Sequence, residues 1–330
     1  MTTYLSAHRA TALRRAAVRA TLAPSVHNTQ PWRLLLRPGE LHLQADRTRQ
    51  LAVLDPTTRK LTISCGCALF NARVSLAADN IAVSVARFPD PAQPDLLASI
   101  TSVEDAASDE PGLAALDRVV ELRQTNRRRF ADDAVPEAVL GILEQAAAAE
   151  GADLHIIRHP EQRIAVAALS QHADAIENLN PAYRAELRAW TTDDPARRDG
   201  VPESAVPHVD AGSDDEIPIR DFDTHGTGGL PTATRSSRNQ CLVLLGTPGD
   251  TARDWLSAGE ALERVLLEIT RHGYAASPLT QVTEVPSARA QLRRELGLTG
   301  YPHVLLRVGR AAMTPGSRRR RLVDVLVEQA

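Results

Sequence analysis

Residues 66–82 read GCALFNARVSLAADNIA, and residues 259–275 read GEALERVLLEITRHGYA. The two stretches share a glycine, an Ala-Leu pair and a closing alanine at the same offsets, and each has the apolar stripe of a helix. Both then reach a residue that tolerates the left-handed backbone common at helix ends, Asn80 in the first and Gly273 in the second. This repeat favours an internal duplication, although Ala and Leu are abundant enough here to match by chance.

The composition is that of a soluble globular protein, with 330 residues, 43% hydrophobic and 24% charged. No apolar run approaches the roughly 20 residues of a membrane span. The acid-free N-terminal stretch lacks a signal-peptide core and leads directly into a polar loop, so we interpret it as a first helix and expect a cytoplasmic protein. A net charge of -3 argues against nucleic acid as the main partner. The three cysteines lack metal-ligand spacing, so no metal is predicted. Lys60 is the only lysine in the sequence.

The pattern around the repeated helices is mixed and predicts an α+β fold. The Pro- and Asp-rich residues 89–109 are expected to link an N-terminal half, 1–107, to a C-terminal half, 108–330. Residues 191–239 are acidic and without sustained periodicity, which is typical of a functional lid or of a disordered loop. Ile217, Ile219 and Phe222 are apolar anchors that favour the lid. Strands are expected at 33–37, 41–45, 82–88, 154–158, 241–245 and 303–308, and helices at 113–122 and 136–150.

Residues 23–32, APSVHNTQPW, form a polar loop between the first helix and the first strand. Ser25, Asn28 and Gln30 carry both hydrogen-bond donors and acceptors, and two prolines stiffen the backbone that presents them. Such a loop suits the polar edge of a heterocycle. It equally suits a capped turn in which these side chains satisfy neighbouring backbone groups.

Two arginine-rich stretches are candidates for an anion site. Residues 123–130 read RQTNRRRF, and residues 318–321 read RRRR ahead of an apolar segment, which predicts that the tail docks on the core. The two clusters could converge on one phosphate, because guanidinium groups bind phosphate bidentately. A solvated basic turn is the alternative for each stretch. Motifs typical of Walker and dinucleotide-binding loops, zinc proteases and serine hydrolases are absent from the sequence.

These stretches together resemble the nitroreductase-fold FMN flavoproteins, in particular their duplicated, single-chain Acg-type branch. APSVHNTQPWRL is similar to the family's A-P-S-x-x-N-x-Q-P-W loop. RQTNRRRF is similar to its R-R-S-x-R-x-F phosphate motif with an additional arginine, which leaves the register among Arg127, Arg128 and Arg129 open. AGEALERVLLEITRHGYAASPLTQ and LGLTGYPHVLLRVGR are similar to its long central helix, flavin-facing turn and closing strand.

The resemblance implies a nitroreductase-like fold of two fused repeats that form an intramolecular pseudo-dimer, with 191–239 as the lid. Only the first half has the Ser/Asn loop and only the second has the arginine motif, so one FMN is expected per chain, held between the halves. The arginine motif and tail would bind the phosphate end, the Ser/Asn loop the polar groups of the flavin, and residues 277–280 the ring, with a backbone N–H reaching N5. The implied cofactor-binding residues are Pro24, Ser25, Asn28, Gln30, Arg123, Thr125, Arg127, Arg128, Ser277, Pro278, Leu279, Thr280, Arg319 and Arg320.

The implied activity is that of an oxidoreductase, in which NAD(P)H delivers hydride to flavin N5 and a small electrophile, a quinone, nitro compound or enone, then accepts it. No protein acid or base is assigned; His27 is a candidate proton donor, with a purely structural loop histidine as the alternative. Flavin storage is a second candidate function, because the acidic lid could close over the ring and exclude the nicotinamide. We expect a monomer that acts as a pseudo-dimer, without nucleic-acid or membrane partners and with further self-association left open.

Overall fold

The structure is a computed structural model that describes residues 2–103, 106, 108, 111–192, 194–202, 205, 220, 222 and 240–329, with residues 2–7 and 111 described by their backbone only. The helices of this part are α1 (Thr2–Ala20), α2 (Arg59–Ala78), α3 (Pro111–Ala114), α4 (Glu137–Ala148), α5 (Pro160–Asn178), α6 (Pro181–Ala189), α7 (Ala252–Arg271), α8 (Gln281–Glu284) and α9 (Pro286–Glu295). The strands are β1 (Trp32–Arg37), β2 (Glu40–Ala45), β3 (Val83–Arg87), β4 (Leu96–Ser102), β5 (Asp153–Ile156), β6 (Cys241–Thr247), β7 (Ala275–Pro278), β8 (Tyr301–Gly309) and β9 (Leu326–Glu328).

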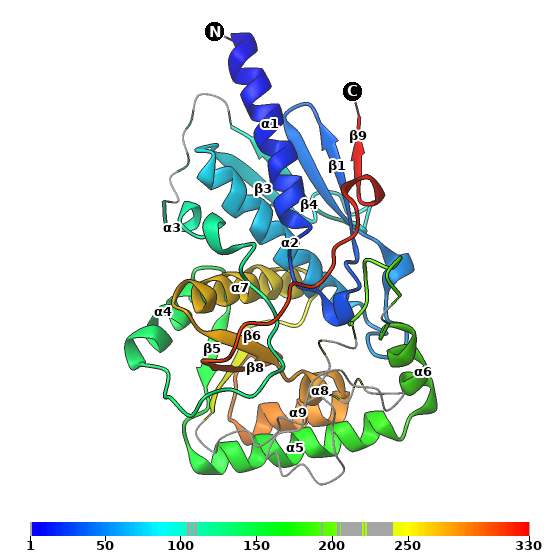
Figure 1. Cartoon of the computed structure of the whole chain (residues 1–330), viewed down its shortest axis with the longest axis vertical. Helices are drawn as coiled ribbons and strands as arrows, with labels where there is room; N and C mark the ends of the chain where they lie inside the picture. Colours follow the sequence, from blue (N-terminus) through cyan, green and yellow to red (C-terminus); the bar gives the residue numbers. More distant parts are fainter. Residues whose placement is uncertain are drawn as a thin grey trace.

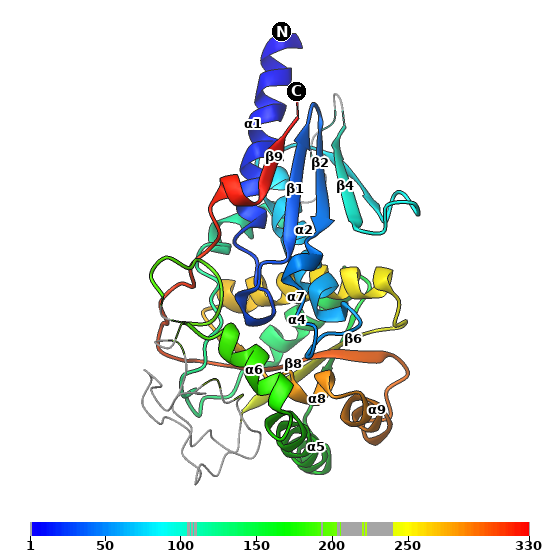
Figure 2. The same ribbon diagram turned by 90° about the vertical axis from the view of Figure 1, so that its right-hand side faces the viewer.

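The strands form two separate sheets, one in each half of the molecule (Figures 1 and 2). The first sheet has the order β3-β4-β2-β1-β9, and the second has the order β5-β6-β8-β7. The predicted hairpin of β1 and β2 is present, and it turns at Gly39, whose φ of 76° requires a residue without a side chain. The predicted α+β class is confirmed.

The C-terminal end of the chain crosses from one half to the other. After β8, the red segment in Figure 1 runs past the central helices to the short 3-10 helix Leu322–Asp324 and then to β9. There β9 pairs in parallel with β1, with Leu326 opposite Leu34. The expectation that the tail docks on the core is therefore confirmed, and the arginine run lies along the boundary between the halves.

Helices α2 and α7 pack on each other at the centre of the molecule (Figure 2). Helix α2 is apolar on nearly every face and almost wholly buried, as such a helix must be in water. It is also long and apolar enough to cross a membrane by length and composition, yet it lies inside the fold as a core helix. Helix α7 begins at a capping box in which Thr251 and Asp254 satisfy each other's backbone N–H groups.

The two helices cross at the repeated glycines. A Cβ atom added to Gly66 would lie 2.2 Å from the carbonyl oxygen of Leu256, and one added to Gly259 would lie 2.0 Å from that of Ile63. Only glycine permits backbones to approach so closely. The repeat noticed in the sequence therefore marks the contact that joins the two halves, and both helices end as predicted, with left-handed φ angles at Asn80 (57°) and at Gly273 (75°).

One continuous apolar core spans the two halves. It includes Leu61 and Leu69 of α2 together with Leu256 and Val265 of α7. Buried ion pairs also cross the boundary, since Glu260 of α7 accepts hydrogen bonds from arginines on α2 and β3. The halves are thus one folding unit rather than two domains joined by a flexible linker.

Two expectations from the sequence are wrong. Residues 113–122 form only α3 and a 3-10 turn, Asp117–Val119, because Asp117 is drawn to arginines of α1, with Arg19 Nε at 3.2 Å from its carboxylate. The expected linker 89–109 contains β4, whose Leu97 and Ile100 are buried. Its prolines precede the strand, where the missing N–H group breaks no ladder hydrogen bond.

Replacing either crossing glycine should destabilise the protein. Gly66→Ala or Gly259→Ala should each lower the free energy of unfolding by about 3 kcal/mol, because a methyl group against rigid backbone has no rotamer that relieves the clash. Gly141→Ala in α4 is the control, since its added Cβ meets nothing within 4 Å. That change should raise stability by about 0.5–1 kcal/mol. Urea denaturation followed by circular dichroism measures the free energy of unfolding of all three variants. Small changes of equal size in the three variants would contradict the close crossing of α2 and α7.

Candidate functional site

The polar loop predicted from the sequence folds against the start of α2. Three non-glycine residues in it have left-handed φ angles, His27 (46°), Asn28 (55°) and Gln30 (51°), a conformation that side chains rarely adopt. The Ser25 hydroxyl accepts a hydrogen bond from the Gln30 backbone N–H at 2.9 Å and holds the turn. The strained loop thereby brings Ser25 and His27 to the wall of a cavity.

This main cavity lies between the two halves and encloses about 940 Å³, its open mouth included. The apolar wall comes from α2, α7 and the second sheet and consists of Ile63, Leu262, Leu266, Ala276, Pro278, Val304 and Leu306. The polar lining includes Ser25, His27, Lys60, Ser64, Thr125, Arg127, Arg220, Thr280 and Glu284.

A smaller basic cavity of about 400 Å³ continues from the main one. The two are parts of one site, because they share the lining residues Pro24, Ser25, Arg123, Gln124, Thr125 and Arg127. The basic cavity adds Asn28 from the loop and Arg319 from the tail. The structure thus brings together the Ser/Asn loop, the arginine motif and the tail, which are far apart in the sequence.

Three arginines line the basic cavity: Arg123 is buried, and Arg127 and Arg319 are half-buried. Arg319 donates hydrogen bonds to Asn28 Oδ1 (3.1 Å) and to the Leu22 carbonyl (3.2 Å), and Arg123 Nε lies 3.3 Å from Glu263 Oε1. Burial and the neighbouring Arg123 lower the pKa of Arg319 to about 9, so it keeps its charge at neutral pH. Burial raises the pKa of Glu263 to about 7 in spite of Arg123. Two cations therefore face one weakly ionised carboxylate, an arrangement that a bound anion would stabilise.

The segment 277–280 alternates its side chains across the cavity wall. Pro278 and Thr280 line the cavity, whereas Ser277 and Leu279 are buried on the other side. This is the alternation that extended backbone imposes. A role of Ser277 and Leu279 toward a ligand would thus be confined to their backbone groups.

Gln30, Arg128 and Arg320 do not line either cavity. The Gln30 side chain is fully buried and joins three segments: its Nε2 donates to the Arg198 carbonyl, and its Oε1 accepts from the Arg320 backbone N–H, both at 2.8 Å. The Arg320 guanidinium donates to the carbonyl of Gln30 (3.2 Å), and the Arg128 carbonyl accepts from Arg307 (3.2 Å). These three residues hold the loops that form the site.

Three charged residues at the main cavity were not predicted. They are Lys60 at the start of α2, Glu284 in α8 and Arg220, and they come from elements far apart in the chain. Arg220 forms an ion pair with Glu284, and its Nη1 lies 3.5 Å from Glu177 Oε2. Lys60 Nζ donates to Thr283 Oγ1 (3.0 Å) and to the His303 carbonyl (2.9 Å). The only sequence signal for any of these three residues was that Lys60 is the single lysine of the chain.

Burial and mutual attraction set the charges of this group. Burial lowers the pKa of Lys60 to about 7, with Glu284 opposing the shift. Burial by itself would raise the pKa of Glu284, but Arg220 and then Lys60 lower it to about 2. Burial raises the pKa of Glu177 to about 8. At pH 7 the Arg220–Glu284 pair is therefore ionised and Glu177 is protonated.

His27 and Phe222 meet at the cavity wall. Their rings are in edge-to-face contact at 5.3 Å, and neither imidazole nitrogen has a hydrogen-bond partner among the residues that the structure describes. Burial, followed by the charge of Arg220, lowers the pKa of His27 to about 3. The imidazole is therefore neutral at pH 7, which argues against its candidate role as a proton donor. Phe222 is buried as expected for a lid anchor, whereas Ile217, Ile219 and most of 191–239 lie outside the described residues.

Sequence comparison identifies relatives over nearly the whole chain, although no family model matches it. The chain is 33% identical over 312 residues to the Mycobacterium tuberculosis protein named "Putative NAD(P)H nitroreductase Rv3131", covering 93% of this chain and 88% of the relative. It is 32% identical over 294 residues to "Putative NAD(P)H nitroreductase acg" from the same organism, covering 88% and 87%.

Solved structures overlap with this one only partially. The FMN-dependent nitroreductase NfnB from Mycobacterium smegmatis is 20% identical and covers 64% of this chain and 97% of its own, with a TM-score of 0.41. A nitroreductase with bound FMN from Desulfitobacterium hafniense is 11% identical and covers 62% and 94%, with a TM-score of 0.40. The family assignment accordingly depends on the sequence relatives.

The α+β fold holds two joined cavities between its halves. By sequence, the chain belongs to the nitroreductase family, as its similarity to the Mycobacterium tuberculosis proteins acg and Rv3131 shows. The resemblance inferred from the loop and arginine motifs is confirmed.

The buried His27 should make the protein less stable in acid. Its pKa is about 3 in the fold against 6.5 when unfolded, so between these values the unfolded state binds more protons and stability falls as the pH falls. His27→Asn keeps a residue type that tolerates the left-handed φ and should reduce this pH dependence by up to about 1.4 kcal/mol per pH unit. Urea unfolding at successive pH values measures the slope. His172→Asn, at an exposed position of α5, is the control, and an unchanged slope in the His27 variant would refute the burial of a neutral imidazole.

Proposed function

We propose that the chain binds one FMN across its two halves and acts as an oxidoreductase that transfers hydride from NAD(P)H to a small electrophile, such as a quinone, nitro compound or enone. The observation that carries this proposal is the pair of joined cavities, one mainly apolar and one basic. Family membership supports it, because two relatives carry NAD(P)H nitroreductase in their names.

The residues present fit a phosphorylated flavin. The Nε atom of Arg319 is buried and has no hydrogen-bond partner among the described residues, and the same is true of both nitrogens of His27. Buried polar atoms are rarely left unpaired, so these atoms indicate a polar ligand. The apolar wall between the two groups suits a flat aromatic ring.

Each part of the site then has a role. Arg123 and Arg319 would hold the phosphate, and Asn28, whose side-chain oxygen accepts from Arg319, orients that guanidinium. Thr125 and Arg127 line both cavities and would bind the chain between phosphate and ring. When bound, FMN supplies a ring that accepts hydride at N5 and passes it to the acceptor. The apolar wall positions this ring and limits access of water.

The two halves, 1–107 and 108–330, would be fused repeats that pair as an intramolecular dimer. The matched helices α2 and α7, which cross at equivalent glycines, support this relation. The crossing of β9 onto β1 supports it as well, because the second half then contributes a strand to the sheet of the first half. Each half also supplies to the cofactor site what the other lacks.

A second function, flavin storage with little turnover, is favoured by the residues at 220–222. Phe222 packs against His27 and beneath the Arg127 guanidinium, whose central carbon lies 4.9 Å from the ring centre. Arg220 is anchored by its ion pair with Glu284. Both residues belong to the proposed lid 191–239, and a lid held in this way would restrict the entry of a nicotinamide.

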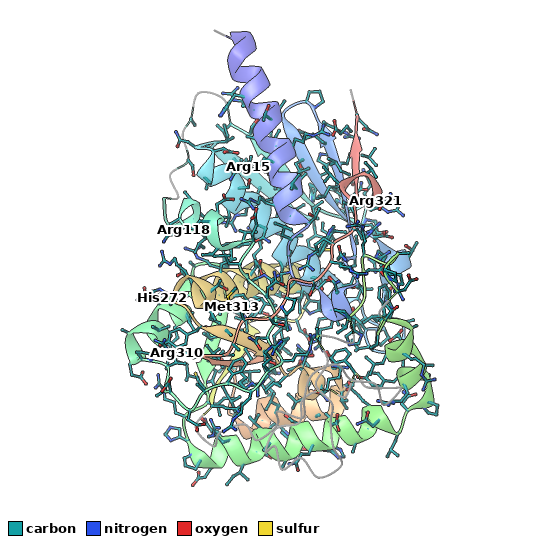
Figure 3. The ribbon with its side chains drawn as sticks, viewed as in Figure 1. Arg15, Arg118, His272, Arg310, Met313 and Arg321 are labelled. Atoms are coloured by element: carbon teal, nitrogen blue, oxygen red, sulfur yellow. The ribbon has the colours of Figure 1, made fainter. Side chains whose placement is uncertain are left out.

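The phosphate role of Arg319 can be tested by comparing two flavins. Arg319→Gln should weaken FMN binding by about tenfold to a hundredfold while riboflavin, which lacks the phosphate, loses much less. Arg321→Gln is the control, because Arg321 is exposed and pairs with Asp324 at 3.1 Å (Figure 3). Titration of flavin fluorescence measures the affinities. Equal losses for the two flavins would exclude a phosphate contact by Arg319.

Anaerobic stopped-flow absorbance separates the oxidoreductase from the storage protein. An oxidoreductase should lose its flavin absorbance rapidly on mixing with NADH or NADPH and regain it with menadione. A storage protein should keep its absorbance, and Phe222→Ala should then allow reduction because the wall at His27 is opened. Purified protein that is colourless and takes up no FMN would contradict both functions.

A further inference from the structure

The main cavity is lined by two basic residues, Lys60 and Arg220, that do not line the basic cavity. We propose that Lys60, backed by Arg220, forms a second anion-binding subsite there, which selects acceptors that carry a carboxylate on a flat apolar body, such as aromatic acids. This inference rests on the proposed function and names the substrate class of the same site.

The position of Lys60 separates it from the proposed phosphate site. Lys60, Arg220 and Glu284 line the main cavity but not the basic one. On α2, Lys60 lies two helical turns before Cys67, which is the cavity-lining residue close to the Arg123–Glu263 pair. At the helical rise of 1.5 Å per residue, the two positions are about 10 Å apart along the axis of α2. A ligand group bound by Lys60 is therefore distinct from the phosphate bound in the basic cavity.

The Lys60 ammonium has capacity for a ligand. It has three protons, and within the described part of the chain it donates to two uncharged oxygens, Thr283 Oγ1 and the His303 carbonyl. An ammonium solvated only by neutral dipoles in a buried site gains strongly from an anion within reach. The remaining proton and the charge are thus available to an acceptor in the cavity.

The charged residues that the structure describes around Lys60 leave one cation uncompensated. Glu284 is paired with Arg220, Asp250 is paired with Arg289 at 2.7 Å, and Glu177 is protonated at neutral pH because burial raises its pKa. Asp55 accepts from the backbone N–H groups of Lys60 and Leu61. The charged groups that act on the ammonium from the elements around it are Asp55, Arg59, Glu284 and Arg289, and His303 is neutral. Within the described part of the chain, Arg59 and protonated Lys60 face the single carboxylate of Asp55, so the cluster has an excess positive charge when Lys60 is protonated.

Apolar side chains adjoin these cations. Ile63 follows Lys60 on α2, Val304 follows His303 on β8, and Phe222 follows Arg220, and all three line the main cavity. A carboxylate alone would fit poorly between such walls, whereas a carboxylate on an aromatic ring would bury its ring against them. The low dielectric of the cavity would strengthen its attraction to the ammonium.

Nuclear magnetic resonance can observe this subsite directly. Because Lys60 is the only lysine, FMN-loaded protein made with carbon-13 labelled lysine gives one lysine signal, whose pH titration reports the ammonium. Benzoate should raise the pKa read from this signal by about one unit or more, because an anion favours the charged form. Benzamide has the same shape without the charge and should not. A signal unchanged by benzoate, or equally shifted by benzamide, would overturn the proposal.

Selectivity provides the second readout. Wild-type protein should favour 4-nitrobenzoate over 4-nitrobenzamide in kcat/KM, and Lys60→Met should lower this ratio by about tenfold. Arg188→Met, which removes a cation from an exposed position on α6, is the matched control and should keep the ratio. An unaltered ratio in Lys60→Met would refute the subsite. If neither nitro compound is reduced, the proposed function fails, whereas the resonance titration of the wild-type protein still tests the anion subsite. The same titration tests the subsite if Lys60→Met does not fold.

Discussion

The direct backbone contact of α2 and α7 at Gly66 and Gly259 sets the distance between the two halves of the molecule. The features that form the cavity are attached to these helices: Lys60 and Ile63 on α2, and Leu262 on α7. The loop that presents Ser25 is hydrogen bonded to α2 through Ser64. A wider separation would therefore change the site as a whole, because a close-packed interior transmits strain instead of absorbing it.

Charge is distributed along the cavity in a way that suits a ligand with two polar ends. The basic cavity concentrates Arg123 and Arg319, while the inner end has Lys60 and the Arg220–Glu284 pair. Between them the wall is apolar. Buried cations without full compensation destabilise the folded state. Such cations are generally found where a bound ligand offsets the destabilisation. The contrast between the two ends thus indicates function more strongly than any single residue does.

The parts of the site that could be predicted are those that are contiguous in the sequence. The loop 23–32 and the arginine stretch 123–130 have side chains spaced for a local turn, so their chemistry was readable before their partners were known. Lys60, Glu284 and Arg220 were not predicted because each is an ordinary residue of its own segment, and only tertiary packing places them together. The two errors in the fold have the same origin. Residues 113–122 have a helical pattern that the contacts of Asp117 override, and β4 follows prolines that are typical of a linker.

The crossing of the chain after β8 has a consequence for limited proteolysis. Arg319, which lines the basic cavity, and β9, which completes the first sheet, both follow the connection that leaves β8. Cleavage within residues 310–317, followed by loss of the C-terminal fragment, would leave an open edge on β1 and an incomplete pocket. One cut would thus damage the first sheet and the candidate site together.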